Sequence, residues 1–237
     1  MQFSAFDAYL FDLDGVITPT AEVHMKAWAE MFNAFLAGFP GQLPWTDADY
    51  FAHVDGKPRY DGVRDFLSSR GIELPEGSPQ DAAAEQSICG LGNRKNETFN
   101  EIIRRDGVAP YPGSKALIEA LQARDAGLAV VSSSRNAVPV LRSAGLADAF
   151  PVIVDGNVAG KQGLAGKPSP DTFRYAAGLL CVEEPRAVVI EDALSGVAAG
   201  AAGGFGLVVG VDRGVGAAAL RQAGAGLVVS DLGELVA

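Results

Sequence analysis

Six short apolar runs constrain the fold of this 237-residue chain more than any other feature of its sequence. They are rich in Val, Ile and Leu and do not alternate with polar residues, a pattern typical of strands buried on both faces of a parallel sheet. Alanine-rich segments with helical spacing separate the later runs. Strand and helix in alternation predict an α/β fold with a Rossmann-like parallel sheet. The predicted strands are residues 8–11, 128–131, 152–154, 187–190, 206–211 and 227–229, and the predicted helices are 114–125, 138–144, 171–180 and 193–202.

The interval between the first two predicted strands follows a different pattern. From about Pro19 to Asp106 no buried strand is predicted, and apolar residues recur at helical spacing instead. Turn-forming clusters at residues 38–44 and 75–79 separate these helices. We therefore expect a helical cap domain, residues 19–106, inserted into a core domain made of residues 1–18 and 107–237.

The composition argues against several classes of protein. The chain has 19 basic and 29 acidic residues, a formal charge of −10, whereas nucleic-acid binding depends on neutralising phosphates with Lys and Arg. No apolar run approaches the roughly 18–20 residues that span a bilayer, and the N-terminal stretch lacks the basic segment of a signal peptide. Cys89 and Cys181 match neither metal-binding nor redox spacing, and both are expected to be buried. We expect a cytoplasmic monomer with a small-molecule substrate and no nucleic-acid or membrane partner.

Acidic side chains follow two of the predicted strands at the point where each strand ends. Asp12 and Asp14 come after the first strand, and Glu191 and Asp192 come after the run 187–190. Because the carboxyl ends of parallel strands meet at one edge of the sheet, these carboxylates are expected to gather there and to repel one another. A divalent cation relieves that repulsion, and oxygen-only ligands favour Mg²⁺. The sequence therefore predicts one Mg²⁺ held by these four residues.

The same edge is predicted to bind and transfer a phosphoryl group. Asp12 is the candidate nucleophile, which would accept the group as an aspartyl-phosphate, and Asp14 is the candidate general acid and base. Ser132 follows the second strand, and the free N–H groups that open the next helix suit phosphate oxygens. Lys167 precedes a predicted helix and supplies a fixed positive charge.

Four motifs in this order resemble those of the haloacid dehalogenase superfamily of phosphotransferases. They are Asp12-Leu-Asp14-Gly15-Val16, Ser132, Lys167-Pro168 and Glu191-Asp192, separated by 120, 35 and 24 residues. The long first gap lies where that superfamily inserts a helical cap. The resemblance implies a Rossmann-like core, an inserted α-helical cap, Mg²⁺ and a phosphoaspartate.

Within the superfamily, the sequence most resembles the β-phosphoglucomutase family. The resemblance implies conversion of β-D-glucose 1-phosphate to glucose 6-phosphate through glucose 1,6-bisphosphate, which also acts as an activator. It implies that the cap closes, excludes water and grips a second phosphate with Arg59. The resemblance further implies substrate or cap roles for Thr20, His24, Trp28, Gly56, Lys57, Arg59, Lys95 and Asn96, and phosphate-binding roles for Ser132, Ser133, Arg135, Asn136 and Lys167.

Several alternatives remain open on the sequence. Pro19 stands where mutases usually carry an acidic residue, Asp55 replaces a cap lysine, and Ala193 replaces a common serine. A phosphatase that hydrolyses a small sugar phosphate would use the same machinery. A signalling receiver domain fits less well, because the chain is too long. A dehalogenase also fits less well, because dehalogenases characteristically lack an acidic residue at the position of Asp14. For His24 the alternative is a partly buried helix histidine, and for Trp28 it is packing.

Overall fold

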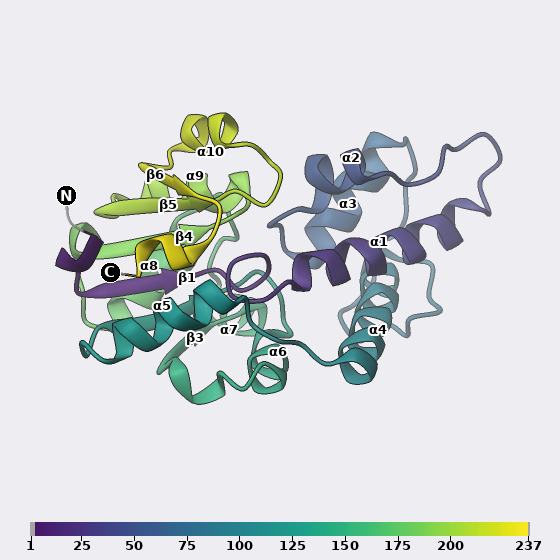
Figure 1. Cartoon of the computed structure of the whole chain (residues 1–237). Coiled ribbons are helices and arrows are strands. Elements are labelled where there is room, and N and C mark those ends of the chain that lie inside the picture. The colour runs from purple at the N-terminus through teal and green to yellow at the C-terminus, as the bar shows by residue number, and fades with distance from the viewer. Residues whose placement is uncertain (1–2, 237) are drawn as a thin grey trace. The chain divides into compact units, whose positions relative to one another are not determined.

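The computed structural model describes residues 3–236, which fall into two compact units (Figure 1). The first unit consists of the described residues up to Thr20 and of the chain from Val108 onward. The second unit is Ala21–Gly107. Each unit has its own apolar core, so each is described by itself.

A six-stranded parallel sheet organises the first unit. The strand order is β3-β2-β1-β4-β5-β6, and every neighbouring pair is parallel. Each of the six predicted strands is present, with ends that differ by at most one residue, and the predicted fold class is confirmed. The strands are β1 Ala8–Phe11, β2 Gly127–Val131, β3 Val152–Val154, β4 Ala187–Glu191, β5 Leu207–Val211 and β6 Leu227–Val229.

Helices and short turns connect these strands. The four predicted helices correspond to α5, α6, α8 and α9, whereas α7 and α10 were not predicted because both lie in glycine-rich sequence. Helix α7 is stabilised at its start by Asp155, whose Oδ1 accepts the N–H groups of Asn157 and Val158, each at 2.9 Å. The helices are α5 Pro112–Gln122, α6 Ala137–Ser143, α7 Gly156–Gln162, α8 Asp171–Leu179, α9 Leu194–Gly203 and α10 Ala217–Ala223, and the 3-10 turns are η1 Phe3–Ala5, η3 Ala147–Ala149, η4 Glu184–Arg186 and η5 Leu232–Leu235.

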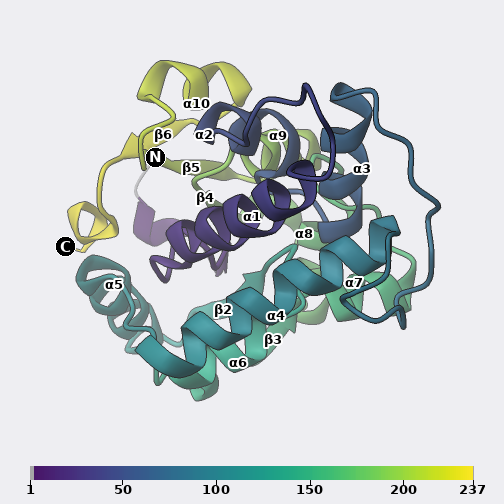
Figure 2. The same cartoon turned by 90° about the vertical axis from the view of Figure 1, so that its right-hand side faces the viewer.

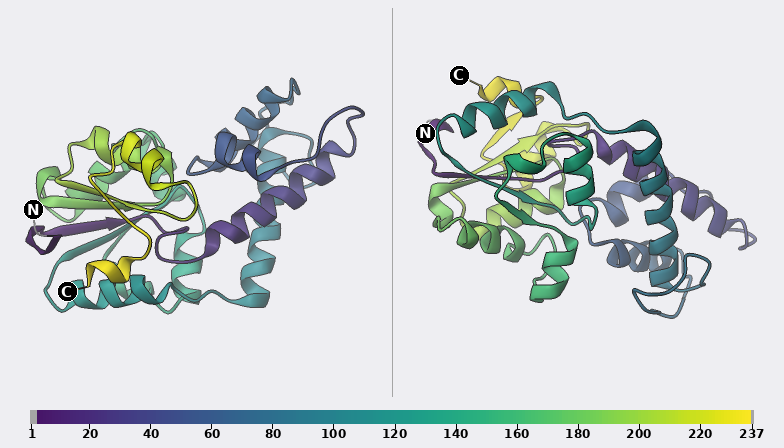
Figure 3. Two further views of the ribbon diagram at one scale, coloured as in Figure 1. Left: turned by 45° about the horizontal axis from the view of Figure 1, so that its top comes forward. Right: turned by 90° about the horizontal axis from the view of Figure 1, so that it is seen from below.

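Alternate strand residues supply the two faces of the sheet. Leu10 of β1 lies in one apolar cluster with Phe173 of α8 and Val197 of α9. Phe11, the next residue position, packs edge-on against Phe150, with ring centroids 5.9 Å apart. Helix α5 lies beside the C-terminal turn η5 (Figure 3). Burial on both faces explains why the strand runs are continuously apolar, and it fixes the residues that follow each strand at one edge.

The second unit is helical throughout its described elements, and its helices are labelled in Figure 2. Its core is aromatic, because Phe32 packs against Trp28, Trp45 and Phe66 with ring centroids 5.3, 4.7 and 4.2 Å apart. Both tryptophans are therefore packing residues of this core. The elements are α1 Thr20–Leu36, α2 Asp47–Asp49, the π-helical turn η2 Tyr50–Val54, α3 Arg59–Ser69 and α4 Ile88–Asp106.

Two further predictions from the sequence concern membrane-spanning helices and the burial of the two cysteines. Among the described residues, no helix combines the length and apolar character needed to cross a membrane. Cys89 is buried, as expected, but Cys181 is exposed, and that expectation was wrong. Cys181 follows the end of α8 in a left-handed conformation with φ 56°, so the chain reverses there at the surface rather than in the core.

Candidate active site

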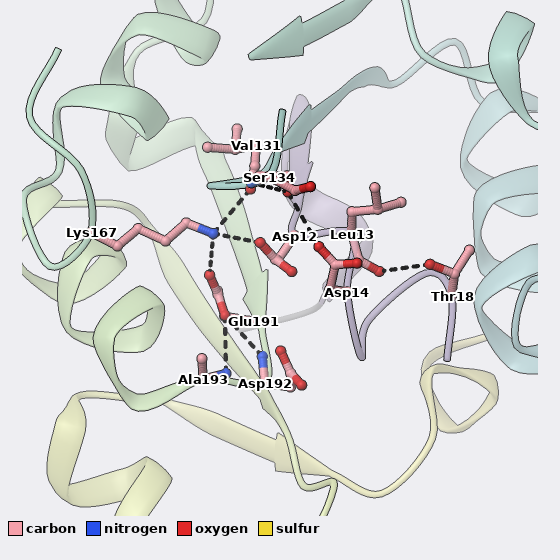
Figure 4. Close-up of polar contacts among 11 residues, drawn as sticks. Asp12, Leu13, Asp14, Thr18, Val131, Ser134, Lys167, Glu191, Asp192 and Ala193 are labelled. Carbon is pink, nitrogen blue, oxygen red and sulfur yellow. Dashed lines mark hydrogen bonds and ion pairs between the residues drawn. The ribbon is translucent and has the colours of Figure 1, made fainter. Parts of the chain in front are cut away.

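Lys167 links the ends of β1, β2 and β4. Its ammonium donates to Asp12 Oδ1 and to Glu191 Oε1, each at 2.5 Å, and to the carbonyl oxygen of Val131 at 3.0 Å (Figure 4). Asp12 follows β1 directly and Glu191 is the last residue of β4. Lys167 is only 4% exposed, so these charge-assisted bonds form out of contact with bulk water.

Three carboxylates meet beside this lysine. Asp12, Glu191 and Asp192 each offer an oxygen, and the three oxygens lie within 4.8 Å of one another. A donor set made only of carboxylate oxygens suits a hard cation such as Mg²⁺ rather than zinc. The sequence predicted that all four acids hold the metal, but the carboxylate of Asp14 is not in this cluster.

The electrostatics of the cluster favour an added positive charge. Burial raises the pKa of Asp12 well above its usual range, and the carboxylates of Glu191 and Asp14 raise it further, against the opposing effect of Lys167. Burial alone would lower the pKa of Lys167, but the carboxylates of Asp12 and Glu191 outweigh it and raise that pKa. Lys167 therefore stays protonated, and its single positive charge does not balance the three clustered carboxylates. The residues fit a divalent cation.

Two glycines give the carboxylates the room they occupy. A Cβ on Gly196, in the first turn of α9, would lie 1.7 Å from Glu191 Oε1. A Cβ on Gly15 would lie 1.9 Å from Asp192 Oδ2, and Gly15 has φ +85°, a conformation that L side chains rarely adopt. The motif that contains Gly15 was recognised in the sequence, but Gly196 was missed. A glycine at the start of an otherwise alanine-rich helix is the signal that could have identified it.

Asp14 has different partners from the other acids. Its Oδ1 accepts a hydrogen bond from the hydroxyl of Thr20, and the hydroxyl of Ser132 lies 3.5 Å from its Oδ2. The hydroxyl of Thr18 in turn lies 2.8 Å from that of Thr20. Asp14 is half-buried and its carboxylate is directed by hydroxyl groups, an arrangement that suits a group exchanging a proton. Thr18 was not singled out in the sequence.

Hydrogen bonds hold the loop that follows β2 in place. The hydroxyl oxygen of Ser132 accepts the N–H of Ser134 at 3.0 Å, and Asn157 Nδ2 donates to the carbonyl oxygen of Arg135 at 3.0 Å. Asn136 is buried at the N-cap position of α6, while Ser133 and Arg135 are half-buried. The hydroxyl oxygen of Ser134 accepts the N–H of Asn136 at 3.1 Å.

Within the second unit, the two cations near the start of α3 have different partners. Arg59 Nη2 donates to Asn96 Oδ1 at 2.7 Å. Lys57 Nζ donates to Asp65 Oδ2 at 2.6 Å, and His53 Nδ1 lies 3.2 Å from the same oxygen. Lys57 is thus bound to a carboxylate of its own unit.

Lys95 of α4 belongs to a buried aromatic cluster. It is 4% exposed, and its Nζ contacts His24 Nδ1 of α1. The same ammonium lies 5.0 Å from the ring centroids of Trp28 and Phe99, and His24 stacks on Phe99 at 4.1 Å. The structure brings three candidate residues together here, namely His24, Trp28 and Lys95, while Gly56, in the left-handed region with φ 68°, lies in the turn before α3.

Comparison with known proteins gives matches over nearly the whole chain. A family model described as haloacid dehalogenase-like hydrolase matches residues 6–204. A β-phosphoglucomutase of Mycobacterium tuberculosis is 50% identical, over 97% of this chain and 91% of the relative, and one of Bacillus subtilis is 32% identical, over 96% and 91%. The solved structure of β-phosphoglucomutase from Clostridium difficile matches with a TM-score of 0.78 at 26% identity, covering 97% of this chain and 93% of the other. The similarity therefore includes both units.

Proposed function

Because the chain belongs to the haloacid dehalogenase-like hydrolase family, we propose that it is a Mg²⁺-dependent phosphotransferase in which Asp12 carries the phosphoryl group, and that it isomerises β-D-glucose 1-phosphate to glucose 6-phosphate. The observation that carries the proposal is the Lys167 ammonium bound to both Asp12 and Glu191 beside a third carboxylate. The similarity to relatives named β-phosphoglucomutase favours the isomerase outcome over hydrolysis.

Asp12 is the proposed nucleophile. An oxygen of its carboxylate attacks phosphorus, the bond between phosphorus and the sugar oxygen breaks, and the electron pair leaves with that oxygen. Lys167, held at Asp12 Oδ1, fixes the direction of the carboxylate and offsets the negative charge of the incoming phosphate. The backbone and hydroxyl groups of the loop Ser132–Asn136 are the proposed ligands of the phosphate oxygens.

Asp14 is the proposed proton carrier. In one half-reaction its carboxylate takes the proton from the sugar 6-hydroxyl as that oxygen attacks the phosphoaspartate, which yields glucose 1,6-bisphosphate. In the other half-reaction Asp14 returns the proton to the sugar 1-oxygen as the 1-phosphate passes to Asp12, which releases glucose 6-phosphate. The Thr20 hydroxyl, which donates to Asp14 Oδ1, holds the carboxylate in a defined direction through both steps.

Asp12, Glu191 and Asp192 would hold the Mg²⁺ ion. When bound, the ion neutralises the carboxylates and the phosphate oxygens so that two anionic groups can approach each other. The clearance above Gly15 and Gly196 keeps Asp192 and Glu191 in the positions where they meet Asp12.

Arg59 is the proposed ligand of the second phosphate of the bisphosphate. Its planar guanidinium matches phosphate oxygens in pairs, and Asn96 holds one of its nitrogens at 2.7 Å. Lys57 is less suited, because Asp65 already neutralises it. Asp55 stands where mutases usually carry a cap lysine, and the ion pair with Asp65 makes Lys57 less suited to substitute for it.

The deciding experiment measures glucose 6-phosphate and inorganic phosphate together, starting from β-glucose 1-phosphate with and without glucose 1,6-bisphosphate. The proposal predicts isomerisation that the bisphosphate activates, little phosphate release and no turnover of the α anomer. Steady phosphate release that is independent of the bisphosphate would instead identify a sugar phosphatase.

A further inference from the structure

Three distant segments of the first unit meet at Arg213, which follows β5 by two residues. Its Nε donates to the carbonyl oxygen of Gly15 at 2.8 Å, and its Nη1 donates to the carbonyl oxygen of Ser230 at 3.1 Å. The guanidinium carbon lies 3.9 Å from the ring centroid of Tyr111, so the group stacks on that ring. Its Nη2 is buried and has no hydrogen-bond partner among residues 3–236. Two carbonyls and one ring therefore hold this side chain.

The position of the Gly15 peptide affects two of the proposed functional residues. Gly15 follows the proposed proton carrier Asp14, and its Cα faces Asp192 so closely that a Cβ would lie 1.9 Å from that carboxylate. A shift of this peptide therefore changes the direction of Asp14 and the space available to Asp192 at the same time. Both residues belong to the proposed active site, whereas these hydrogen bonds of Arg213 go to backbone carbonyl oxygens.

The neighbouring carbonyls of this loop are held in a similar way. Ser114 donates its hydroxyl to the carbonyl oxygen of Val16 at 2.6 Å, and the N–H of Tyr111 donates to that of Ile17 at 2.9 Å. Gly15 thus carries the first of three consecutive carbonyls fixed by groups from elsewhere in the unit. Of these three contacts, the one from Arg213 acts on the residue nearest to Asp14.

We propose that Arg213 is a positioning residue for phosphoryl transfer, which acts by fixing the Gly15 peptide and through it the relative placement of Asp14 and Asp192. The inference rests on the proposed function of these two acids. A lysine cannot replace the arginine, because a single ammonium lacks the planar fork that reaches two separate carbonyls while it lies flat on Tyr111. The inference assigns no contact between Arg213 and substrate.

The test compares Arg213→Lys with Arg174→Lys. Arg174 is a matched control, because its guanidinium also donates to a backbone carbonyl, that of Gly203, at 3.4 and 3.2 Å from Nε and Nη2. Each variant is assayed for isomerisation of β-glucose 1-phosphate and for hydrolysis of p-nitrophenyl phosphate, and Mg²⁺ binding is measured by calorimetry. Since a misplacement of about 1 Å can reduce the rate about a hundredfold, we expect R213K to lower kcat by about tenfold to a hundredfold on both substrates. KM is expected to stay within about twofold, Mg²⁺ affinity to fall several-fold, and R174K to change none of these values.

Other outcomes overturn the inference or the proposal beneath it. A folded R213K with wild-type kcat and Mg²⁺ affinity contradicts the inference alone, as does a rise in KM that accounts for the whole loss. If R213K does not fold, Tyr111→Leu removes only the supporting ring, and it must show the same loss of kcat at constant KM, in smaller measure, or the inference fails. A wild-type protein that neither turns over these substrates nor binds Mg²⁺ refutes the proposed function itself, and the inference with it.

Discussion

Replacing Gly196 by alanine should destabilise the protein, although alanine is the better helix former. Gly196 lies in the first turn of α9, and in an ordinary helix the exchange stabilises by about 1 kcal/mol. Here the new Cβ would lie 1.7 Å from Glu191 Oε1 and 2.0 Å from the carboxyl carbon, where an ordinary contact begins at 3.4 Å. The higher helix propensity of alanine therefore favours the variant, whereas the steric clash with a buried carboxylate disfavours it.

The size of the effect follows from what the collision breaks. Glu191 must move by about 1.7 Å to regain an ordinary contact, which separates it from Lys167, 2.5 Å away, in a place where Glu191 is 1% exposed. Breaking a buried ion pair costs about 3–5 kcal/mol. After the helical gain is subtracted, we expect Gly196→Ala to lose about 2–4 kcal/mol of unfolding free energy and most of its Mg²⁺-dependent activity.

Urea unfolding in Mg²⁺-containing buffer, with Gly178→Ala as the control, measures this effect. Gly178 lies in helix α8, and a Cβ there meets nothing within 4 Å, so the control should gain about 0.5–1 kcal/mol. The reasoning is refuted if the two variants have equal stability, or if Gly196→Ala keeps the wild-type dependence of activity on Mg²⁺.

The remaining predictions concern the second phosphate, the metal and the lysine. Arg59→Ala should reduce isomerisation far more than hydrolysis of p-nitrophenyl phosphate, while Lys57→Ala should affect both little; equal losses in Arg59→Ala on both substrates would exclude a distal phosphate ligand. Free Mg²⁺ at a hundred times its Kd should stabilise the protein by about 2.7 kcal/mol, which is measured as a rise in Tm. Asp192→Asn should lose most of that rise, and an unchanged rise would show that Asp192 is not a metal ligand. Lys167→Met should abolish turnover and lower the Tm, because it leaves Asp12 and Glu191 buried without a counter-charge; a stable and active variant would contradict the arrangement in Figure 4.

The sheet was predictable because its strands are buried on both faces. A run such as Ala187–Ile190 is continuously apolar for that reason. Helix α10 was not predictable in the same way, since its 7 residues lie in glycine-rich sequence and contain a single buried residue, Leu220. Short helices with little buried surface leave little periodicity to detect.

The grouping of the site was predictable from one topological rule. Asp12, Ser132 and Glu191 lie at the ends of three neighbouring parallel strands, so their proximity follows once the sheet is recognised. The comparisons with known proteins then confirmed the resemblance that the four motifs had indicated.

The directions of side chains and the contacts between distant segments could not be predicted from the sequence. The carboxylate of Asp14 accepts a hydrogen bond from Thr20 and is not one of the three clustered acids. The closeness of Gly196 to Glu191, and of Arg213 to Gly15, depends on how elements pack. Such contacts leave no spacing pattern along the chain.

The most direct test of the account is to trap and locate the phosphoryl group on the protein. The enzyme is mixed with ³²P-labelled glucose 1,6-bisphosphate and quenched in acid, and the ³²P bound to the protein is counted. A second portion is reduced with borohydride, which converts an acyl phosphate to the alcohol and releases the phosphate, and the converted residue is identified by mass spectrometry. The account predicts that residue 12 is recovered as homoserine and that Asp12→Asn takes up no label. Turnover with no trapped intermediate, or a phosphoryl group located on any other residue, would contradict it.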